Sequence, residues 1–255
     1  MTSKINPDDL KKIMGWADED MQEVMSQLDE GAMNAWMRQL PGIFQGMNLK
    51  SSMTIIDMPS GNGRVSIPLA QKYHVKVLGY DIIPAYIRRS NLLAAKRHVK
   101  HFCTFKKADI RTVVKKKNVC DLLLWIAAPN LWKDSKKTIK MLRNCVKSGG
   151  RILIADAYLY SMAGKRVYPD YKLLDQMNQG YAAFGDKIER FIDYKDTLWT
   201  SDYNRCKKST RTFLQKANDS KSKEVLWRRL RILEKEEISD KKHLGLGIWI
   251  IRVMK

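Results

Sequence analysis

The sequence predicts an α/β fold in which helices cover both faces of a mostly parallel sheet. Short apolar runs alternate along the chain with segments that repeat apolar residues at helical spacing. A turn with two glycines follows the first of these runs, and a further long apolar run covers residues 244–253. Such alternation is typical of parallel strands joined by crossover helices.

The turn at residues 57–63 lies between the first predicted strand, which starts at Met53, and a predicted helix. Gly61 and Gly63 allow the backbone to turn sharply and to lie against a ligand. The helix start offers free N–H groups and a positive dipole end, whereas Asp57 at the strand end offers a negative charge. A ligand that carries both an amine and a carboxylate therefore fits this turn better than a phosphate.

The composition is typical of one large folded domain. Of the 255 residues, 44% are hydrophobic, which is enough to build a core. No apolar run reaches the roughly 20 residues of a membrane span, and no signal peptide is visible, so we expect a cytoplasmic protein without a membrane partner. The four cysteines are widely spaced and form no Cys-x-x-Cys pair, so we expect no metal site.

The net charge of +20 makes this a basic protein, and the charge is uneven. Residues 1–60 carry 5 Lys and Arg against 9 Asp and Glu, so this part has a net charge of −4 and the remainder +24. A basic body is consistent with nucleic acid or another polyanion as partner, but a solvated lysine-rich surface is the more common explanation. Lys115, Lys116 and Lys117 precede a strand, which puts them at the edge of the sheet opposite to the ligand edge. We therefore favour the solvated surface.

Residues 1–50 are expected to form a helical segment before the main domain of residues 51–255. Asn6 with the following Pro-Asp-Asp is a good helix start, and apolar residues recur at helical spacing up to Leu40. We expect these helices to end near Pro41-Gly42. The segment either caps the ligand edge or packs on the domain, and both interpretations stay open.

The second and third predicted strands are each followed by an acid. Residues 75–80 lead to Asp81, twenty residues after Gly61, where a carboxylate can bind both ribose hydroxyls of an adenosine-containing cofactor. A helix over residues 84–98 leads to a strand at 102–106. Asp109 follows, and taken alone it would be an ordinary loop or helix-capping residue.

The fourth predicted strand, residues 119–127, ends at the expected ligand edge and is followed by Asn130 and Trp132. Asn130 is as well suited to capping a helix as to orienting a ligand. The next helix is expected to carry Ile139 to Val146 on one face.

The glycine pair 149–150 is expected to end this helix. Residues 151–155 are the fifth strand, which ends at Asp156.

Residues 158–185 are rich in tyrosine and glycine, and they include Tyr158 and Tyr160. Such a segment suits a variable pocket, although a surface helix with amphipathic tyrosines is the plainer interpretation. We treat about 158–190 as an insertion on the ligand side. The rest is expected to form a strand at 191–200, two charged helices at 201–217 and 222–237, and a buried strand at 244–253.

The segment Asp57-Met58-Pro59-Ser60-Gly61-Asn62-Gly63 resembles the glycine-rich first motif of class I S-adenosylmethionine-dependent methyltransferases, with Pro59 where the first glycine is usual. The glycine pair before the fifth strand and the final apolar strand are also similar to that family. The resemblance covers residues 53–156 well. It implies a Rossmann-like sheet of seven strands with an antiparallel last strand, and an N-terminal helical cap. It also implies S-adenosyl-L-methionine as cofactor and in-line methyl transfer to a small-molecule acceptor.

The resemblance also implies residue roles. Asp57 would hold the amino group of the methionine moiety, Asp81 the ribose and Asp109 the adenine amino group. The implied cofactor set is Asp57, Pro59, Ser60, Gly61, Gly63, Asp81, Ile82, Asp109, Ile110 and Ala127. The acceptor-side candidates are Asn130, Trp132, Asp156, Tyr158 and Tyr160. No residue stands out as a general base, so no catalytic residue is assigned.

Three alternatives stay open. A nicotinamide-dependent (NAD) dehydrogenase would use the Gly61–Asp81 spacing, but Ser66 stands where the third glycine is needed, and Asp57 would face a pyrophosphate. An RNA methyltransferase would use the basic surface, but no RNA-binding motif is visible. A non-catalytic nucleic-acid-binding module would lose binding above moderate salt. The sequence indicates neither the acceptor nor the oligomeric state.

Overall fold

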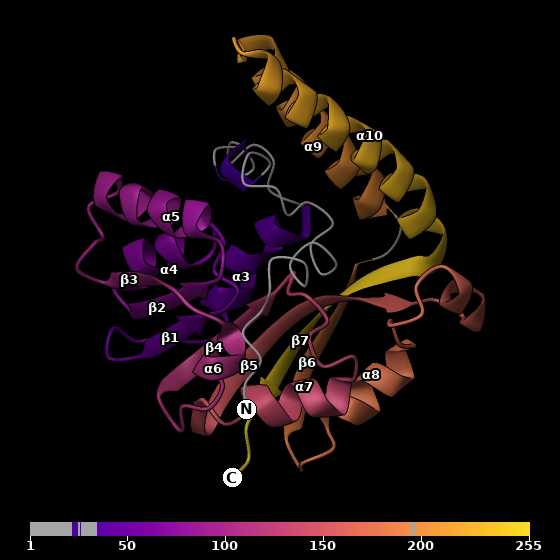
Figure 1. The fold of residues 1–255 in the computed structure, drawn as a ribbon. Helices are drawn as coiled ribbons and strands as arrows, with labels where there is room; N and C mark the ends of the chain where they lie inside the picture. Colours follow the sequence, from indigo (N-terminus) through magenta and orange to yellow (C-terminus); the bar gives the residue numbers. More distant parts are fainter. Residues whose placement is uncertain (1–21, 25, 27–34, 195–196) are drawn as a thin grey trace.

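A seven-stranded sheet in the order β3-β2-β1-β4-β5-β7-β6 forms the centre of the molecule (Figure 1). The structure is a computed structural model that describes residues 22–24, 26, 35–194 and 197–255. The strands are β1 (Thr54–Asp57), β2 (Lys76–Asp81), β3 (Cys103–Lys107), β4 (Cys120–Ile126), β5 (Val146–Leu159), β6 (Lys187–Tyr194) and β7 (Leu244–Arg252).

The pairing of the strands confirms the predicted mostly parallel sheet. β1 pairs with β2 and β4 in parallel, and the parallel pairing continues to β3 on one side and β5 on the other. β7 runs antiparallel between β5 and β6. The switch point of the sheet therefore lies between β1 and β4, and parallel sheets bind ligands at the carboxyl edge of such a point.

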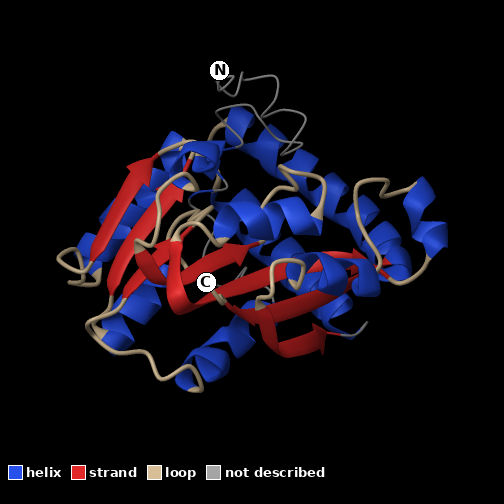
Figure 2. Cartoon of the chain, turned by 90° about the horizontal axis from the view of Figure 1, so that it is seen from below, coloured by secondary structure: helices blue, strands red, loops and turns tan. Residues whose placement is uncertain are grey.

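Helices cover both faces of the sheet (Figure 2). One face packs on α3, α4 and α5, and the other packs on α6, α7 and α8. The bounds are η2 (Ala35–Gln39), α3 (Leu40–Gln45), α4 (Ser66–Tyr73), α5 (Pro84–Lys96), α6 (Ile110–Val113), α7 (Ser135–Leu142), η3 (Met162–Arg166) and α8 (Leu174–Tyr181). The two buried layers fix β1 and β4 from both sides, so their carboxyl ends are held rigidly.

Helices α9 (Thr197–Lys216) and α10 (Ser220–His243) connect β6 to β7 in the sequence. They lie side by side and extend beyond the sheet (Figure 1). The predicted apolar face of the second helix is confirmed, since Val225, Leu226, Leu230 and Leu233 are all buried. Both helices are longer than predicted. None of the described helices combines the length and the apolar character that a bilayer crossing requires.

The predicted helix end near Pro41-Gly42 is wrong. Both residues lie inside α3, where Pro41 occupies the first turn. A proline is tolerated there, because the N–H group that it lacks would have no partner within the helix. The expected helix start at Asn6 lies outside the described residues.

The predicted helix through Val146 is also wrong. Helix α7 ends at Leu142, and Val146 already pairs with Cys120 as the first residue of β5. The next pair is Leu122 with Arg151, so β5 carries an irregularity over residues 147–150. Gly149 has φ 75°, and a Cβ at Gly150 would come within 2.8 Å of the Asp121 carbonyl. The glycine pair therefore allows a bulge within a strand and does not end a helix.

The predicted strand at 191–200 is placed too late in the chain. The strand covers Lys187–Tyr194, and Thr197 already begins α9. β6 is an edge strand with a register shift between Ile188 and Arg190, and its residues do not alternate regularly between buried and exposed. The period-two signal that marks a strand in a sequence is therefore weak here.

Candidate functional site

The glycine turn lies at the carboxyl ends of β1, β2 and β4, as predicted. Its backbone is fixed on both sides: Met58 N–H donates to the Leu124 carbonyl in β4, and Ser60 N–H donates to the Tyr80 carbonyl in β2. The Met58–Pro59 peptide bond is cis. The turn is therefore an ordered part of the sheet edge.

The two predicted glycines have positive φ angles, 51° at Gly61 and 79° at Gly63, which favour glycine. A Cβ at Gly63 would come within 2.7 Å of Ile67 Cδ1, so this glycine is needed for packing as well. A Cβ at Gly61 would meet no atom within 4 Å. The backbone at Gly61 therefore borders open space, as a surface that receives a ligand requires.

Asp57 is the last residue of β1 and is almost completely buried, with 2% of its surface exposed. Burial is the largest effect on its carboxyl group and raises the pKa to about 7, although the Ser66 hydroxyl lowers it and the charge of Asp81 raises it further. A buried carboxylate without a cation is costly, so this position is suited to a positively charged group.

Asp81 is the last residue of β2, and its carboxylate is tied to the glycine turn. Oδ2 accepts from Gly61 N–H at 2.8 Å, and Oδ1 accepts from Ile83 N–H at 2.9 Å. Burial raises the pKa of Asp81 to about 6, and these backbone hydrogen bonds lower it in part. Asp57 and Asp81 together give the carboxyl edge of the sheet a negative field wherever they are ionised. An ionised carboxylate offers about four acceptor positions, so Asp81 still has the capacity to accept from two hydroxyls.

One hydroxyl group beside the turn, that of Ser60, is buried without a hydrogen-bond partner among the described residues. The Ser66 hydroxyl at the start of α4 lies beside the Asp57 carboxylate and lowers its pKa. Buried polar groups in folded proteins usually have partners, so a polar ligand at this place would supply one for Ser60. This observation fits a cofactor with an amino acid end.

Asp109 lies close to Asp81. Ala108, which follows the end of β3, donates its N–H to the carbonyl of Asp81 at the end of β2. Its carboxylate caps α6 through Arg111 N–H and forms a two-point ion pair with the Arg111 guanidinium, with distances of 2.8–3.1 Å. The capping role that the sequence allowed is therefore present. The contact with adenine stays a prediction. Ile82 is half-buried and Ile110 is buried on the same edge.

The acceptor-side candidates come from β4, β5 and the loops that follow them. Ala127 has φ 47°, a left-handed conformation that is strained for alanine, and its N–H donates to the Ala155 carbonyl. Asn130 Nδ2 donates to the Asp170 carbonyl, and Trp132 stacks on Trp125 with ring centroids 5.4 Å apart. The loop after β4 is thus fixed to the segment before α8.

The candidates Asp156 and Tyr158 on β5 and Tyr160 just after it differ in their surroundings. Asp156 is half-buried, and burial raises its pKa to about 7. Tyr158 is buried in the sheet and donates to Asp193 Oδ1 in β6, whereas Tyr160 is exposed. The site roles of all three stay predictions.

Three further side chains, of Tyr86, Arg64 and Arg229, act on the surroundings of Asp81 and were missed in the sequence. Tyr86 lies in the first turn of α5. Burial is the main cause that raises the pKa of its hydroxyl, and the negative charge of the nearby Asp81 raises it further. The positive charges of Arg64, just after the glycine turn, and of Arg229 in α10 lower the pKa of the same hydroxyl. A tyrosine shortly after the second-strand acid was the only signal, and it is too common to be specific.

The N-terminal segment reaches this edge. Asn62 Nδ2 donates to the Ser26 carbonyl at 3.3 Å, and Arg88 of α5 forms an ion pair with Glu23 at 2.7 Å. These two contacts place residues 23 and 26 beside the glycine turn and the start of α5.

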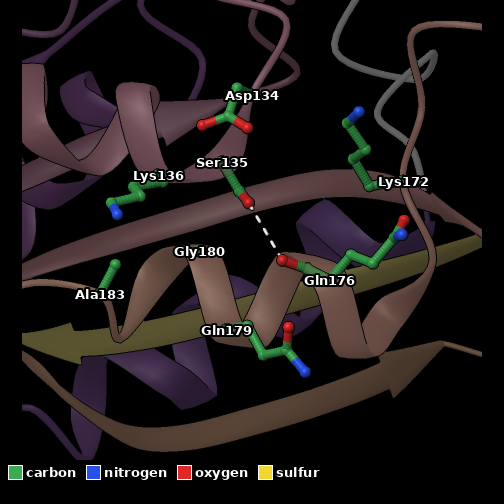
Figure 3. A pocket seen from close by; sticks show the side chains of 8 residues that line it. All are labelled: Asp134, Ser135, Lys136, Lys172, Gln176, Gln179, Gly180 and Ala183. Carbon is green, nitrogen blue, oxygen red and sulfur yellow. Dashed lines mark hydrogen bonds between the residues drawn. The ribbon is translucent and has the colours of Figure 1, made fainter.

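A separate pocket of about 370 Å³ lies between the start of α7 and α8 (Figure 3). Its walls are polar, and the Ser135 hydroxyl in it already donates to the Gln176 carbonyl. None of the predicted site residues lines it; the lining residues are Asp134, Ser135, Lys136, Lys172, Gln176, Gln179, Gly180 and Ala183. Within the described residues, no cluster of His, Cys, Asp and Glu has the arrangement of a metal site.

A family model described as a methyltransferase domain matches residues 49–217. Tocopherol O-methyltransferase, a chloroplastic protein of Arabidopsis thaliana, is 27% identical over 146 residues. The match covers 55% of this chain and 41% of that protein, so it spans less than half of the relative's length.

Solved structures of low sequence identity share the fold. A SAM-dependent methyltransferase from Geobacter sulfurreducens in complex with S-adenosyl-L-homocysteine has a TM-score of 0.74 at 17% identity, over 92% of this chain and 97% of that one. The cyclopropane synthase MmaA2 from Mycobacterium tuberculosis has a TM-score of 0.75 at 11% identity, over 98% and 99% of the two chains. At these identities the likeness establishes the architecture.

Proposed function

The chain belongs to the methyltransferase-domain family, and on that premise we propose that it transfers the methyl group of S-adenosylmethionine to a hydroxyl group of a small molecule. The observation that carries the proposal is the glycine turn, which has open space at Gly61 and the buried carboxylates of Asp57 and Asp81 beside it. The bound donor supplies a methyl group that its sulfonium already activates. The protein therefore has to align the reactants and exclude water.

Asp57 and Ser60 suit the methionine end of the donor. The buried Asp57 carboxylate gains a cationic partner when it meets an ammonium group, which removes the cost of its isolated charge. The Ser60 hydroxyl gains a hydrogen-bond partner in the same place. The open backbone at Gly61 leaves room for the ligand to lie against the turn that Pro59 and Gly63 help to shape.

Asp81 suits the ribose end, because its carboxylate keeps acceptor capacity after binding Gly61 N–H and Ile83 N–H. Ile82 and Ile110 offer apolar surface for the adenine. Asp109 would have to give up part of its ion pair with Arg111 to accept from the adenine amino group. The proposed contacts follow the strand order along the edge: adenine at the end of β3, ribose at β2 and the methionine part at β1.

The acceptor is proposed to lie beyond Ala127, between the loop after β4 and the segment before α8. Residues 158–190 supply this side, and Asn130 joins the two loops through the Asp170 carbonyl. The similarity to tocopherol O-methyltransferase supports a small hydroxyl-bearing acceptor with aromatic character. A cytoplasmic location stays a prediction, as does the preference for a small molecule over RNA.

The N-terminal segment is proposed to cap the donor site in front of the domain of residues 51–255. The support is local: Ser26 accepts from Asn62 in the glycine turn, and Glu23 pairs with Arg88 on α5. A segment held at both the turn and the neighbouring helix reduces the access of water to the reacting groups.

Calorimetric titration with S-adenosylhomocysteine tests the proposal. The parent protein is expected to bind in the micromolar range (roughly −8 kcal/mol), with little change between low and high salt. Asp57→Asn is expected to weaken binding at least about tenfold, because it removes the partner of the ammonium group.

Asp121→Asn is the matched control. Asp121 lies on the same sheet but at the start of β4, where it pairs with Lys147 and accepts from Thr54 N–H. It should leave the binding unchanged. Binding of NAD in place of S-adenosylhomocysteine, or salt-sensitive binding of a short RNA alone, would refute the proposed function.

A further inference from the structure

Asp156 occupies the position in β5 that lies just beyond the end of β4. Ala155 pairs with Ile126, the last residue of β4, and its carbonyl accepts from Ala127 N–H. On the other side, Asp156 pairs with Gly247 of β7, and the rings of Phe191 and Trp249 fill the space that a Cβ of this glycine would take. Asp156 therefore stands at the carboxyl edge of the parallel part of the sheet, directly beside Ala127, the strained residue that follows β4.

The register of the strands gives its distance from the donor end of the site. Asp57 is level with Leu124, and Leu124 is level with Leu153, so Asp156 lies two strands away and three residues further on. Strand spacing and rise make the Cα–Cα distance roughly 14 Å. Because side chains alternate along a strand and this offset is odd, Asp156 points to the face that α8 covers, whereas Asp57 points to the face that α4 covers. The two carboxyl groups therefore flank the carboxyl edge from opposite faces, and the donor and the acceptor would lie on the edge between them.

The carboxylate of Asp156 is poorly compensated. Oδ1 accepts only from the N–H of Ala157, at 2.8 Å, and within the described residues nothing donates to Oδ2 and no Lys, Arg or His forms an ion pair with it. Burial is the main cause that raises its pKa to about 7, and the Ala157 hydrogen bond lowers it in part. A carboxylate in this state holds a proton more firmly than one in water.

The titratable groups that face Asp156 are the hydroxyls of Tyr171, from the loop before α8, and Tyr181, from α8 itself. Burial is the first cause that raises the pKa of each tyrosine, and the charge of Asp156 raises it further. Both therefore stay protonated at neutral pH and do not compete with Asp156 for protons.

These tyrosines are fixed by their neighbours. Tyr181 is 1% exposed and packs edge-on against Trp249. Lys165 donates to the carbonyls of Pro169 and Tyr171 and so holds the backbone of the loop. The described surroundings of Asp156 are thus fixed and aromatic, which suits an aromatic hydroxyl compound.

We propose that Asp156 accepts the proton of the acceptor hydroxyl during methyl transfer. The inference rests on the proposed function. The acceptor oxygen forms a bond to the methyl carbon while the bond from that carbon to sulfur breaks and its electron pair stays on sulfur. The hydroxyl proton passes to Asp156 Oδ2 and leaves to solvent after the product departs. Asp156 is then the general base that the sequence did not reveal.

Transfer to phenols of different acidity tests this role. Asp156→Asn removes the base and keeps the shape. It is expected to slow the methylation of 4-methoxyphenol, which is protonated at about pH 8, by roughly 100-fold or more. 4-Nitrophenol is largely ionised at that pH and needs no base, so its methylation should fall by less than about threefold. An equal loss with both phenols would mean that Asp156 acts only structurally, and would overturn the inference.

Asp193→Asn is the matched control, since Asp193 lies two strands away from Asp156, accepts from Tyr158 OH and keeps this hydrogen bond as an amide. It should leave both rates unchanged. The affinity for S-adenosylhomocysteine should also be the same in Asp156→Asn as in the parent, which separates the two proposals. A parent protein that does not bind S-adenosylhomocysteine refutes the proposed function, whereas one that binds it but methylates no phenol refutes the present inference.

A measurement without any acceptor adds a second test. In protein labelled with ¹³C at the aspartate carboxyl groups, one resonance that is lost in Asp156→Asn should titrate with a midpoint near 7. If that resonance stays in its ionised form down to about pH 5, Asp156 cannot hold the proton as proposed.

Discussion

Two buried carboxyl groups at the carboxyl edge of the sheet are suited to ligand binding but lower the stability of the unliganded protein. Asp57 and Asp81 are 2% and 4% exposed, and burial raises their pKa values to about 7 and about 6. An acid whose pKa is raised in the folded state favours folding at low pH, and this contribution is lost as the pH rises from about 4 to 7. The site is therefore expected to destabilise the unliganded protein at neutral pH.

Asp57→Asn tests that expectation through the melting temperature. The amide carries no charge, so at about pH 8 the variant should be more stable than the parent, with an upper limit of about 4 kcal/mol from a shift of about three pKa units. At about pH 4 the parent carboxyl is protonated and the gain should disappear. Thermal melts at both pH values measure the difference, and a gain of equal size at both would contradict the assigned cause.

Asp81→Ala tests the proposed ribose contact, and the fold of the variant is measured alongside its affinity. The variant removes the proposed ribose contact and leaves Gly61 N–H and Ile83 N–H without their partner. We expect the affinity for S-adenosylhomocysteine to fall by at least tenfold, or about 1.4 kcal/mol, while the fold is retained. Calorimetry and circular dichroism measure the two effects. Unchanged affinity would show that the ribose assignment is wrong.

At the scale of the elements, α9 and α10 are joined to the domain by a polar contact as well as by apolar packing. Tyr203 of α9 and Tyr168 of the loop after η3 both donate to Asp240 of α10. The Ser239 hydroxyl of α10 donates to the Tyr168 oxygen at 2.8 Å. The carboxylate of Asp240 therefore joins three segments that are far apart in the sequence.

Tyr203→Phe is expected to loosen this contact. A hydrogen bond to a charged group contributes about 1.5–3 kcal/mol, and Tyr203 is 8% exposed, so water replaces it poorly. Amide hydrogen exchange should become faster in α9 and α10 and stay unchanged in β1 and β4. Tyr73→Phe is the control, because the Tyr73 hydroxyl is buried without a partner among the described residues, and its loss should not destabilise the protein. The same response to both substitutions would argue against a specific role of Asp240.

Elements with strong local signals were predictable, and those that tertiary pairing decides were not. The glycine turn at Gly61 follows from local chemistry, and so does the buried face of α10. Val146 was assigned to a helix because its spacing fits one, but pairing with Cys120 makes it part of β5. The capping role of Asp109 is local, and the sequence allowed it. The surroundings of Asp156 depend on Tyr171 and Tyr181, which no local pattern reveals.

At the scale of the whole molecule, a buried ion pair fixes the end of β7 to the body. Asp186 has no exposed side-chain surface and binds the Arg143 guanidinium at 2.7 and 2.9 Å. Asp186 also accepts from Met254 N–H, and Arg143 donates to the Met254 carbonyl. The pair joins the end of α7, the start of β6 and the end of β7.

Asp186→Ala is expected to lower the free energy of unfolding by about 3–5 kcal/mol, because it leaves the Arg143 charge without its partner. Urea unfolding measures this loss. Lys133→Ala is the control: Lys133 pairs with Asp170 at 3.6 Å, with 72% and 53% of the two side chains exposed, and its removal should cost at most about 1 kcal/mol. A loss as small as that of the control would show that the buried pair contributes no net stability.

The position of β7 between β5 and β6 has a consequence for biosynthesis. During translation, β6 leaves the ribosome before the strand that must lie between it and the rest of the sheet, and the 47 residues of α9 and α10 with their connection separate the two. Until β7 is made, β5 exposes an apolar edge and β6 has no partner, which is the condition under which nascent chains aggregate or recruit chaperones. The helical hairpin forms from local contacts and can fold during this interval, so that it brings β7 back to the gap in the sheet.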